Sequence, residues 1–383
     1  MKELSVLVVD DNPIQLTVME RQLSKYGISN IITCDNGEEA LRAVSESQFD
    51  IIFSDIVMPE MEGITLIRSL DNMGYKGALA IASGAGASIV SSLSYMSQKL
   101  RFSNVYGLNK PISDSLLKDI FEKESHIKTV STKQKMKQVN IDELTIALSE
   151  NQFKNYYQPQ TDYSTGAIVG LEALARWNHP TNGLIFPDIF IPMLSKMGQE
   201  TELFRLVLKN VLVDISEGRI KCGVSINVTQ SDTVMPGFVD YLLDQCNFYN
   251  VEPSLITLEL TEHGVYEESV EMITNMARLR LYGFGISIDD FGVGSSSYLK
   301  LSHLPFTEIK IDKDFVFGCI GNETKMSIIK SMCTLAKNMH IKLVSEGVED
   351  DITWKAMQEL GVDVCQGYYT GKPMPIEALD LAG

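Results

Sequence analysis

The segment Gly285-Ile286-Ser287-Ile288-Asp289-Asp290-Phe291-Gly292-Val293-Gly294 decides how the larger part of this chain folds. Apolar residues alternate at its start, which predicts a β-strand. Two adjacent carboxylates follow where the strand should end, and strand ends are where α/β proteins build their sites. Glycines then permit a tight loop. Because adjacent carboxylates repel unless a cation lies between them, the segment predicts a divalent metal site; the alternative is a solvated acidic turn.

Length and composition restrict the class of protein. With 383 residues the chain is long enough for two domains. No apolar run reaches the roughly 18 residues that a membrane span needs, and no signal segment opens the chain, so we expect a cytoplasmic protein without a membrane partner. The six cysteines form no CxxC pair, which favours reduced core thiols over a disulfide framework or a zinc site. A net charge of −17 argues against DNA as a partner.

Charge also divides the chain. Residues 1–123 carry a net charge of −5, residues 124–139 are polar and basic with a net charge of +3, and residues 140–383 carry −15. We therefore expect a first domain over 1–123, a linker or linking helix over 124–139, and a second domain over 140–383. An anionic substrate of so acidic a second domain would need metal ions to screen the charge.

The first domain is expected to be an α/β domain with a doubly wound parallel sheet of the (βα)5 type. Apolar segments predict strands over Leu4–Val9, Ile28–Cys34, Asp50–Asp55, Ala78–Ala82 and Val105–Asn109. Helical periodicity appears between them, for example over residues 14–23 and 38–44. Continuous apolar strands that alternate with helices are typical of a sheet that is buried on both faces.

Polar side chains end four of these strands. They are Asp10 and Asp11, Asp55, Ser83, and Lys110. Because the carboxyl ends of parallel strands meet at one edge of a sheet, we expect these side chains to converge. Three acids can hold Mg²⁺, and a hydroxyl and an ammonium group can hold a phosphoryl group.

This pattern resembles the receiver domain of two-component response regulators. The resemblance implies that Asp55 is the phosphoacceptor and that Asp10, Asp11 and Asp55 bind one Mg²⁺. It also implies that Ser83 and Lys110 are switch residues that contact the phosphoryl group, and that a sensor histidine kinase or a phosphotransfer protein is a partner. The chain departs from the family at the aromatic switch position, which is Gly107 here, with Tyr106 beside it.

The second domain is expected to be a TIM-type (β/α)8 barrel. Strands are predicted at 153–158, 168–176, 224–228, 255–259, 286–290, 308–312, 342–345 and 362–366, with helical patterns between most of them. Polar residues end these strands: Glu172, Asn227, Glu259, Glu262, Asp289, Asp290, Lys310, Asp312, Glu346, Glu349 and Gln366. Each could be a cap or a surface residue, but together they predict a ring at the barrel mouth. Oxygen ligands without histidine or cysteine favour two Mg²⁺ or Mn²⁺ ions, which suit phosphodiester hydrolysis.

Glu172-Ala173-Leu174 resembles the name-giving triplet of the EAL family of cyclic di-GMP phosphodiesterases. The likeness extends from about residue 140 to the C-terminus and includes Asp289-Asp290-Phe-Gly, Lys310-Ile-Asp312 and Glu346-Gly-Val-Glu349. It implies that Glu172, Asn227, Glu259 and Asp289 hold one metal, and Asp289, Asp290 and Glu346 the other. Gln158, Leu174, Arg176 and Gln366 would bind the dinucleotide.

The resemblance further implies the catalytic roles. Lys310 would position the attacking water, with Asp312 beside it, and Glu346 is a candidate base. Glu262 would steady the loop from Asp290 to Tyr298, and Glu349 would also serve catalysis. Related enzymes associate through the barrel, so we expect a homo-oligomer, a dimer or higher.

The sequence therefore predicts a two-component response regulator whose output is hydrolysis of cyclic di-GMP to linear pGpG, controlled by phosphorylation of Asp55. The alternatives are a catalytically silent cyclic di-GMP receptor or protein-interaction module, and a barrel that acts on another phosphodiester. We expect phosphorylation to activate the enzyme by changing how often the loop after Asp290 is ordered.

Overall fold

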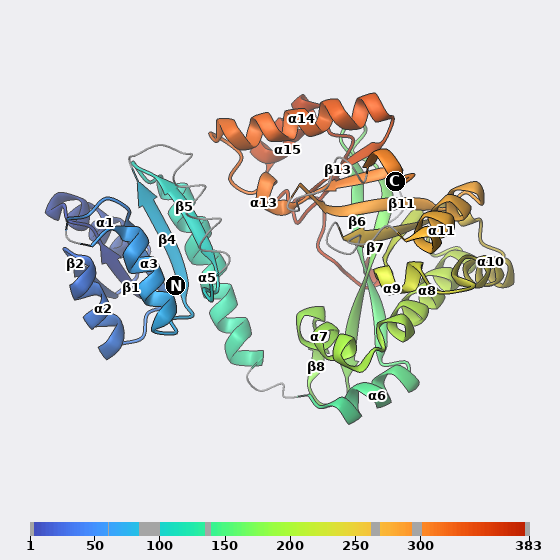
Figure 1. Ribbon diagram of the computed structural model, residues 1–383, viewed down its shortest axis with the longest axis horizontal. Coiled ribbons are helices and arrows are strands. Elements are labelled where there is room, and N and C mark those ends of the chain that lie inside the picture. Colours follow the sequence, from blue (N-terminus) through green and yellow to red (C-terminus); the bar gives the residue numbers. More distant parts are fainter. Residues whose placement is uncertain are drawn as a thin grey trace. The chain divides into compact units, whose positions relative to one another are not determined.

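The computed structural model describes residues 4–59, 61–83, 100–134, 139–261, 269–292 and 301–379. The chain divides into two compact units, Met1–Gln138 and Val139–Gly383, which are blue to cyan and green to red in Figure 1. Among the described helices, none combines the length and the apolar character that crossing a membrane requires.

The first unit contains a parallel sheet with the strand order β2-β1-β3-β4-β5. Its strands are β1 (Ser5–Val9), β2 (Asn30–Cys34), β3 (Ile51–Asp55), β4 (Ala78–Ser83) and β5 (Val105–Asn109). Its helices are α1 (Pro13–Lys25), α2 (Gly37–Glu46), α3 (Gly63–Asn72) and α5 (Asp114–Gln134). This confirms the expected doubly wound sheet.

Strand alternation divides the core of this unit between the two faces of the sheet. Val6 and Val8 of β1 pack with residues of α1 and α5. Leu7 and Val9, which point the other way, pack with residues of α2 and α3. Helices therefore cover both faces, which is why the strands are apolar throughout.

Helix α5 continues well past residue 123. Glu124, the first residue of the expected linker, is buried and accepts hydrogen bonds from Tyr106 Oη (2.6 Å) and Asn104 Nδ2 (2.8 Å). Burial, followed by this hydrogen bond, raises the pKa of Tyr106 far above its usual value. Tyr106, beside the glycine at the switch position, is therefore tied to α5 and belongs to the core.

The second unit is a closed barrel. Its strands are β6 (Phe153–Asp162), β7 (Ile168–His179), β9 (Gly223–Asn227), β10 (Ile256–Thr261), β11 (Gly285–Phe291), β12 (Glu308–Ile311), β13 (Lys342–Glu346) and β14 (Val364–Gln366). They are hydrogen-bonded in the order β6-β14-β13-β12-β11-β10-β9-β7, and the β6–β7 pairing closes the circle. The expected eight-stranded barrel is confirmed.

One strand departs from the strictly parallel arrangement of a TIM barrel. Strand β6 is antiparallel to both of its neighbours, β7 and β14. The five residues 163–167 between β6 and β7 are too few for a crossover helix, so the two strands form a hairpin. A short strand, β8 (Gly183–Ile185), pairs antiparallel with the end of β7 and lies outside the closed circle of strands.

Helices surround the barrel and enclose its apolar core (Figure 1). They are α6 (Ile141–Ser149), α7 (Pro187–Met197), α8 (Glu200–Ser216), α9 (Gln230–Thr233), α10 (Phe238–Tyr249), α11 (Val270–Leu281), α13 (Lys313–Val316), α14 (Glu323–Met339) and α15 (Asp351–Leu360). Asn140 and Glu143 form a capping box that starts α6, the first helix of the second unit.

Candidate active site

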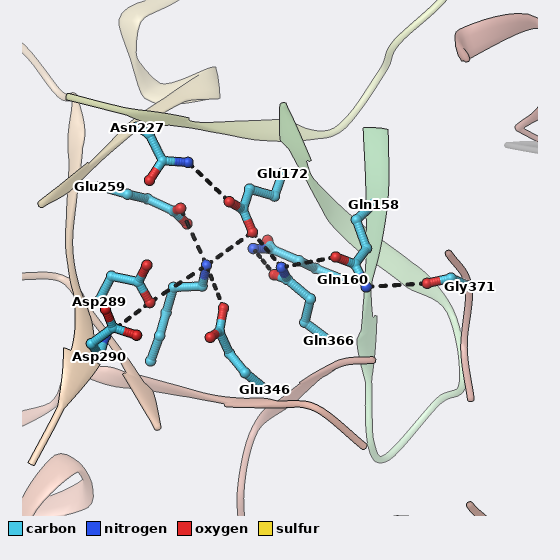
Figure 2. Close-up of polar contacts among 11 residues, drawn as sticks. Gln158, Gln160, Glu172, Asn227, Glu259, Asp289, Asp290, Glu346, Gln366 and Gly371 are labelled. Atoms are coloured by element: carbon cyan, nitrogen blue, oxygen red, sulfur yellow. Dashed lines mark hydrogen bonds and ion pairs between the residues drawn. The ribbon is translucent and has the colours of Figure 1, made fainter. Parts of the chain in front are cut away.

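The carboxyl ends of the barrel strands bring a ring of polar side chains together (Figure 2). Strand pairing explains the ring: Glu259 lies opposite Asn227, Asp289 opposite Thr261, and Glu346 opposite Gln366. Neighbouring strands thus each contribute a polar residue near their carboxyl ends, although Asp289 stands two residues beyond the partner of Glu259 in register. The ring is therefore built by the register of the strands rather than by any one loop.

Lys310 is the centre of this ring. Its side chain is fully buried, and Nζ lies 2.7 Å from Glu346 Oε1, 3.0 Å from Glu172 Oε2, 3.2 Å from Glu259 Oε2 and 3.8 Å from Asp289 Oδ1. Burial by itself would lower the pKa of Lys310, but the surrounding carboxylates outweigh burial and hold its pKa well above the usual value. The lysine is therefore permanently charged.

One lysine cannot neutralise four carboxylates, and their pKa values separate accordingly. Burial raises the pKa of Glu259 and Asp289, and it raises that of Glu346 to about 8. Burial also favours protonation of Glu172, but Lys310 and a hydrogen bond from Gln366 outweigh it and keep the pKa of Glu172 below its usual value. The site thus contains more carboxyl groups than its lysine can keep ionised while no metal ion is bound.

Both carboxylates of the Asp289–Asp290 pair reach the site because the strand is irregular there. The register between β11 and β12 shifts between Ile288 and Phe291. Asp290 has a φ of 55°, in the left-handed region that is uncommon for a residue other than glycine, and its N–H donates to Asp289 Oδ1 at 2.9 Å. Burial, followed by the charge of Asp289 and a hydrogen bond to Asp312, raises the pKa of Asp290 to about 7.

The donor set fits hard divalent cations. Oxygen atoms of Asp289, Asp290 and Glu346 lie close enough together to hold a metal ion. Beside them, Glu259 Oε1 is buried and has no hydrogen-bond partner among the described residues. An unpaired buried carboxylate oxygen is costly unless a cation compensates it. Clustered carboxylates with a spare oxygen suit a hard divalent cation.

Metal binding is expected to release protons. At pH 7 Glu346, with a pKa of about 8, is mostly protonated, and Asp290, with a pKa of about 7, is half protonated. Because metal ions bind the ionised forms, roughly one to two protons should leave per site at pH 7, and metal affinity should rise between about pH 6 and pH 9. Calorimetric titration with Mg²⁺ in buffers of different ionisation enthalpy measures this number. A titration heat that is independent of the buffer would contradict the prediction.

Other expected residues line or flank the ring. Arg176 is buried, and its guanidinium lies 5.2 Å from the centre of the Phe186 ring and 5.8 Å from that of Tyr156. Gln158 is buried and donates to the carbonyl of Gly371 at 3.2 Å. Leu174 is half-buried in β7.

Of three further residues that the sequence singled out, Asp312 and Glu349 are described. Asp312 caps α13 by accepting from Asp314 N at 2.7 Å, and it contacts Asp290. Glu349 is exposed. Glu262 and the loop 293–300 lie outside the described residues.

Sequence reasoning missed two residues that contact this site. Gln160 is buried in β6 and donates to Gln366 at 3.0 Å, and Phe186 packs on Arg176. A signal for Gln160 was present, since it stands two residues after Gln158 and must share its face of the strand.

A second acidic cluster lies at the strand ends of the first unit. Oxygen atoms of Asp10, Asp11 and Asp55 lie close enough together to hold a metal ion. Lys110 Nζ lies 2.6 Å from Asp10 Oδ2 and 2.8 Å from Asp55 Oδ2. A small cavity lined by Gln15, Gln22 and Ile112, among others, borders Asp55. Ser83 ends β4, which pairs with β3 beside Asp55; its side chain is outside the described parts.

Comparison with known proteins adds to this geometry. The response regulator receiver domain family matches residues 6–122, and the EAL domain family matches residues 141–373. The cyclic di-GMP phosphodiesterase RocR of Pseudomonas aeruginosa is 29% identical over 390 residues, which cover 98% of this chain and 97% of RocR.

Two further matches concern the barrel. The bifunctional diguanylate cyclase/cyclic di-GMP phosphodiesterase MucR of Pseudomonas aeruginosa is 32% identical over 243 residues, which cover 62% of this chain and 36% of MucR. The solved PaMucR phosphodiesterase in complex with c-di-GMP is 32% identical, with a TM-score of 0.58, and the match covers 62% of this chain and 98% of that one. The residue pattern, the closed barrel and these matches together show that the chain belongs to the EAL domain family. It carries a response regulator receiver domain ahead of its EAL domain.

Proposed function

We propose that this protein hydrolyses cyclic di-GMP to linear pGpG with divalent metal ions, under the control of phosphorylation at Asp55. The observation that carries the proposal is the ring of carboxylates around the fully buried Lys310 at the mouth of a closed barrel. In support, RocR, which matches nearly the whole chain, is named a cyclic di-GMP phosphodiesterase, and PaMucR was solved with c-di-GMP.

Two groups of oxygen ligands are assigned to two metal ions, Mg²⁺ or Mn²⁺. The first group is Glu172, Asn227, Glu259 and Asp289; the second is Asp289, Asp290 and Glu346. When bound, such ions stabilise negative charge on the phosphate and lower the pKa of water. A single Mg²⁺ is assigned to Asp10, Asp11 and Asp55 of the receiver, next to Lys110 and Ser83. Among the described residues, no histidine or cysteine belongs to the ring, which agrees with hard cations.

Substrate binding is assigned to Gln158, Leu174, Arg176 and Gln366. Arg176 supports this assignment best. Its guanidinium is buried between aromatic rings and forms no ion pair with a carboxylate in the parts of the chain that are described. An arginine without a carboxylate partner can pair with a phosphate oxygen, and its planar group suits bidentate contact.

Each step of the hydrolysis is assigned to particular groups. A water oxygen bonds to phosphorus and the bond from phosphorus to the 3′ oxygen breaks, because pGpG keeps its phosphate on the 5′ side. Lys310 positions the attacking water, and Glu346 accepts its proton. The 3′ oxygen leaves with a proton from solvent. Asp312, which contacts Asp290, is assigned a place beside Lys310 and the attacking water. Glu262 is assigned to steady the loop from Asp290 to Tyr298. Glu349 is assigned a further role in catalysis.

One assay tests the proposed function. The purified protein is incubated with Mg²⁺ or Mn²⁺ and cyclic di-GMP, and the products are separated by chromatography. We expect pGpG. Binding of cyclic di-GMP without pGpG from a folded, metal-loaded sample would instead favour the silent receptor, and cleavage of other phosphodiesters alone would favour the third alternative.

Phosphorylation of Asp55 is expected to raise kcat by about fivefold or more, the low end of typical allosteric couplings. Lys110 contacts both Asp10 and Asp55, so a phosphoryl group on Asp55 must rearrange these contacts. Turnover is measured with and without beryllofluoride, a phosphate mimic. The Asp55→Asn variant is the control and should not respond. Equal turnover of the native chain under both conditions would show that the receiver does not control the barrel.

We also propose the domain limits, the phosphoryl donor and the state of assembly. Domain limits of 1–123, 124–139 and 140–383 are retained as proposals, with a sensor histidine kinase or phosphotransfer protein as the phosphoryl donor. Association through the barrel as a dimer or larger oligomer is also proposed. Light scattering on the purified chain tests the oligomer, and a monomer at catalytic concentrations would exclude it.

A further inference from the structure

A chain of buried amides runs beside the ring of carboxylates (Figure 2). Gln158 and Gln160 stand two residues apart on β6 and so face the barrel interior together. Gln158 lies opposite Glu172 of β7, and Gln160 lies opposite Gly170. Gln366 of β14 completes the group, and all three glutamines are at least nine-tenths buried.

The amides all point the same way. Gln160 Nε2 donates to Gln366 Oε1 at 3.0 Å, and Gln366 Nε2 donates to Glu172 Oε2 and, at 3.5 Å, to Gln158 Oε1. Gln158 Nε2 then donates to the carbonyl of Gly371 at 3.2 Å. Gln160 therefore begins the chain as a donor, and Gln366 and Gln158 each present their oxygen to a donor and their nitrogen to an acceptor.

The donor-to-acceptor direction of these hydrogen bonds decides which group faces the carboxylate of Glu172. Its Oε2 accepts from Lys310 and Gln366, while its Oε1 accepts from Asn227 Nδ2 at 2.9 Å. If the amide of Gln366 turned by half a rotation, its oxygen would face a buried carboxylate, and two acceptors would repel each other in a poorly screened interior. The donor of Gln160 prevents that rotation, because it requires an oxygen at its own end of Gln366.

Gly170 makes the arrangement possible. A Cβ at this position would lie 2.5 Å from Gln160 Oε1, closer than real Cβ contacts. The absence of a side chain on β7 thus leaves the space in which the amide of Gln160 lies. Gly170 does not have a left-handed φ, so the space, and not the backbone conformation, is what a side chain would disturb.

We propose that Gln160, in the space left by Gly170, is a positioning residue that orients Gln366 and through it the carboxylate of Glu172 for metal binding. The inference rests on the proposed function only in taking Glu172 as a metal ligand. Residues that orient a ligand typically change metal affinity by about 10- to 100-fold when they are replaced.

The first test removes the donor and keeps the volume. Gln160→Met should weaken Mn²⁺ binding to the full-length protein by about tenfold, measured without substrate from the electron paramagnetic resonance signal of free Mn²⁺. The receiver cluster contributes equally in every variant and cancels in the comparison. Thr161→Val, the next residue on β6, is the matched control and should bind Mn²⁺ as the native chain does. At saturating metal, kcat of Gln160→Met should return to within a few-fold of native.

The second test keeps the amide and moves it. Gly170→Ala should reproduce the loss in Mn²⁺ affinity, because the new methyl group displaces the amide of Gln160. In a Gln160→Ala background the methyl group has room, so adding Gly170→Ala should cost no further affinity. Two changes that act through one contact are not additive, and this cycle detects that.

Two results would overturn the proposal. The first is that folded Gln160→Met binds Mn²⁺ as tightly as the native chain. The second is that Gly170→Ala lowers Mn²⁺ affinity by the same factor in the native chain and in the Gln160→Ala background. Circular dichroism and thermal unfolding establish that the variants fold. Because the readout is metal binding, it stands apart from hydrolysis: a native chain that bound Mn²⁺ but produced no pGpG would refute the proposed function and leave this comparison valid.

Discussion

Asp289→Asn is expected to lower hydrolysis of cyclic di-GMP by about 10³-fold at saturating metal, which corresponds to about 4 kcal/mol of transition-state stabilisation. Asp289 is assigned to both metal ions, so its charge acts on both. The substitution keeps the volume of the side chain and removes the charge. Initial rates of pGpG formation measure the effect, and Asp244→Asn on the exposed part of α10 is the control.

The same variant should fold at least as well as the native protein when metal is absent. Burial raises the pKa of Asp289, so the folded state disfavours its ionised form. As the pH rises through the pKa of Asp289 in the folded state, ionisation of this residue lowers the free energy of unfolding. Asparagine cannot ionise and so removes that loss. Thermal unfolding in chelator at pH 8 tests this. Near-native rates would show that Asp289 is no metal ligand, and a large loss of stability would show that the loss of activity is only structural.

Lys310→Met is expected to reduce kcat by about 10³-fold while KM changes little, since the ammonium group is assigned to the attacking water and not to the substrate. It should also lower the free energy of unfolding of the metal-free protein by about 3 to 5 kcal/mol, because its buried carboxylate partners lose their cation. Steady-state kinetics and denaturant unfolding measure the two effects. Lys154→Met, at an exposed position of β6, is the control.

Divalent metal should compensate part of the lost stability in this variant. Mg²⁺ supplies positive charge to the same carboxylates, so the increase in stability on adding Mg²⁺ should be larger for Lys310→Met than for the native protein. Activity should not recover, because the water is no longer positioned. A variant whose KM rises while its kcat is unchanged would instead make Lys310 a substrate contact.

Much of the architecture could be read from local sequence. Apolar runs such as residues 51–55 and 286–288 mark strands because a strand buried on both faces can carry little else. Acids and a lysine stand directly after these runs, and parallel strands place all such ends at one edge. The two acidic clusters follow from that rule without any knowledge of loop structure.

Other features depended on contacts between residues far apart in the chain. The polar, basic composition after residue 123 predicted a linker or a linking helix, but only the structure shows that Glu124 is buried and accepts hydrogen bonds from Tyr106 and Asn104. Strand β6 has an apolar-polar pattern that is compatible with either direction, so the hairpin with β7 became evident only in the structure. Gln160 lies beyond the predicted strand 153–158, and its contact with Gln366 became evident only in the structure.

The sequence by itself determined which residues end the strands, and therefore the order of the two domains and the oxygen-only character of the site. Tertiary structure alone decided how those residues meet. The register shift in β11 and the left-handed backbone of Asp290 turn two adjacent carboxylates to one side. Closure of the barrel brings Glu172, Glu259 and Glu346 within about 3 Å of a single lysine. Charge and hydrogen bonding act over distances of a few ångströms, and which groups come that close is set by strand register, which no local pattern encodes.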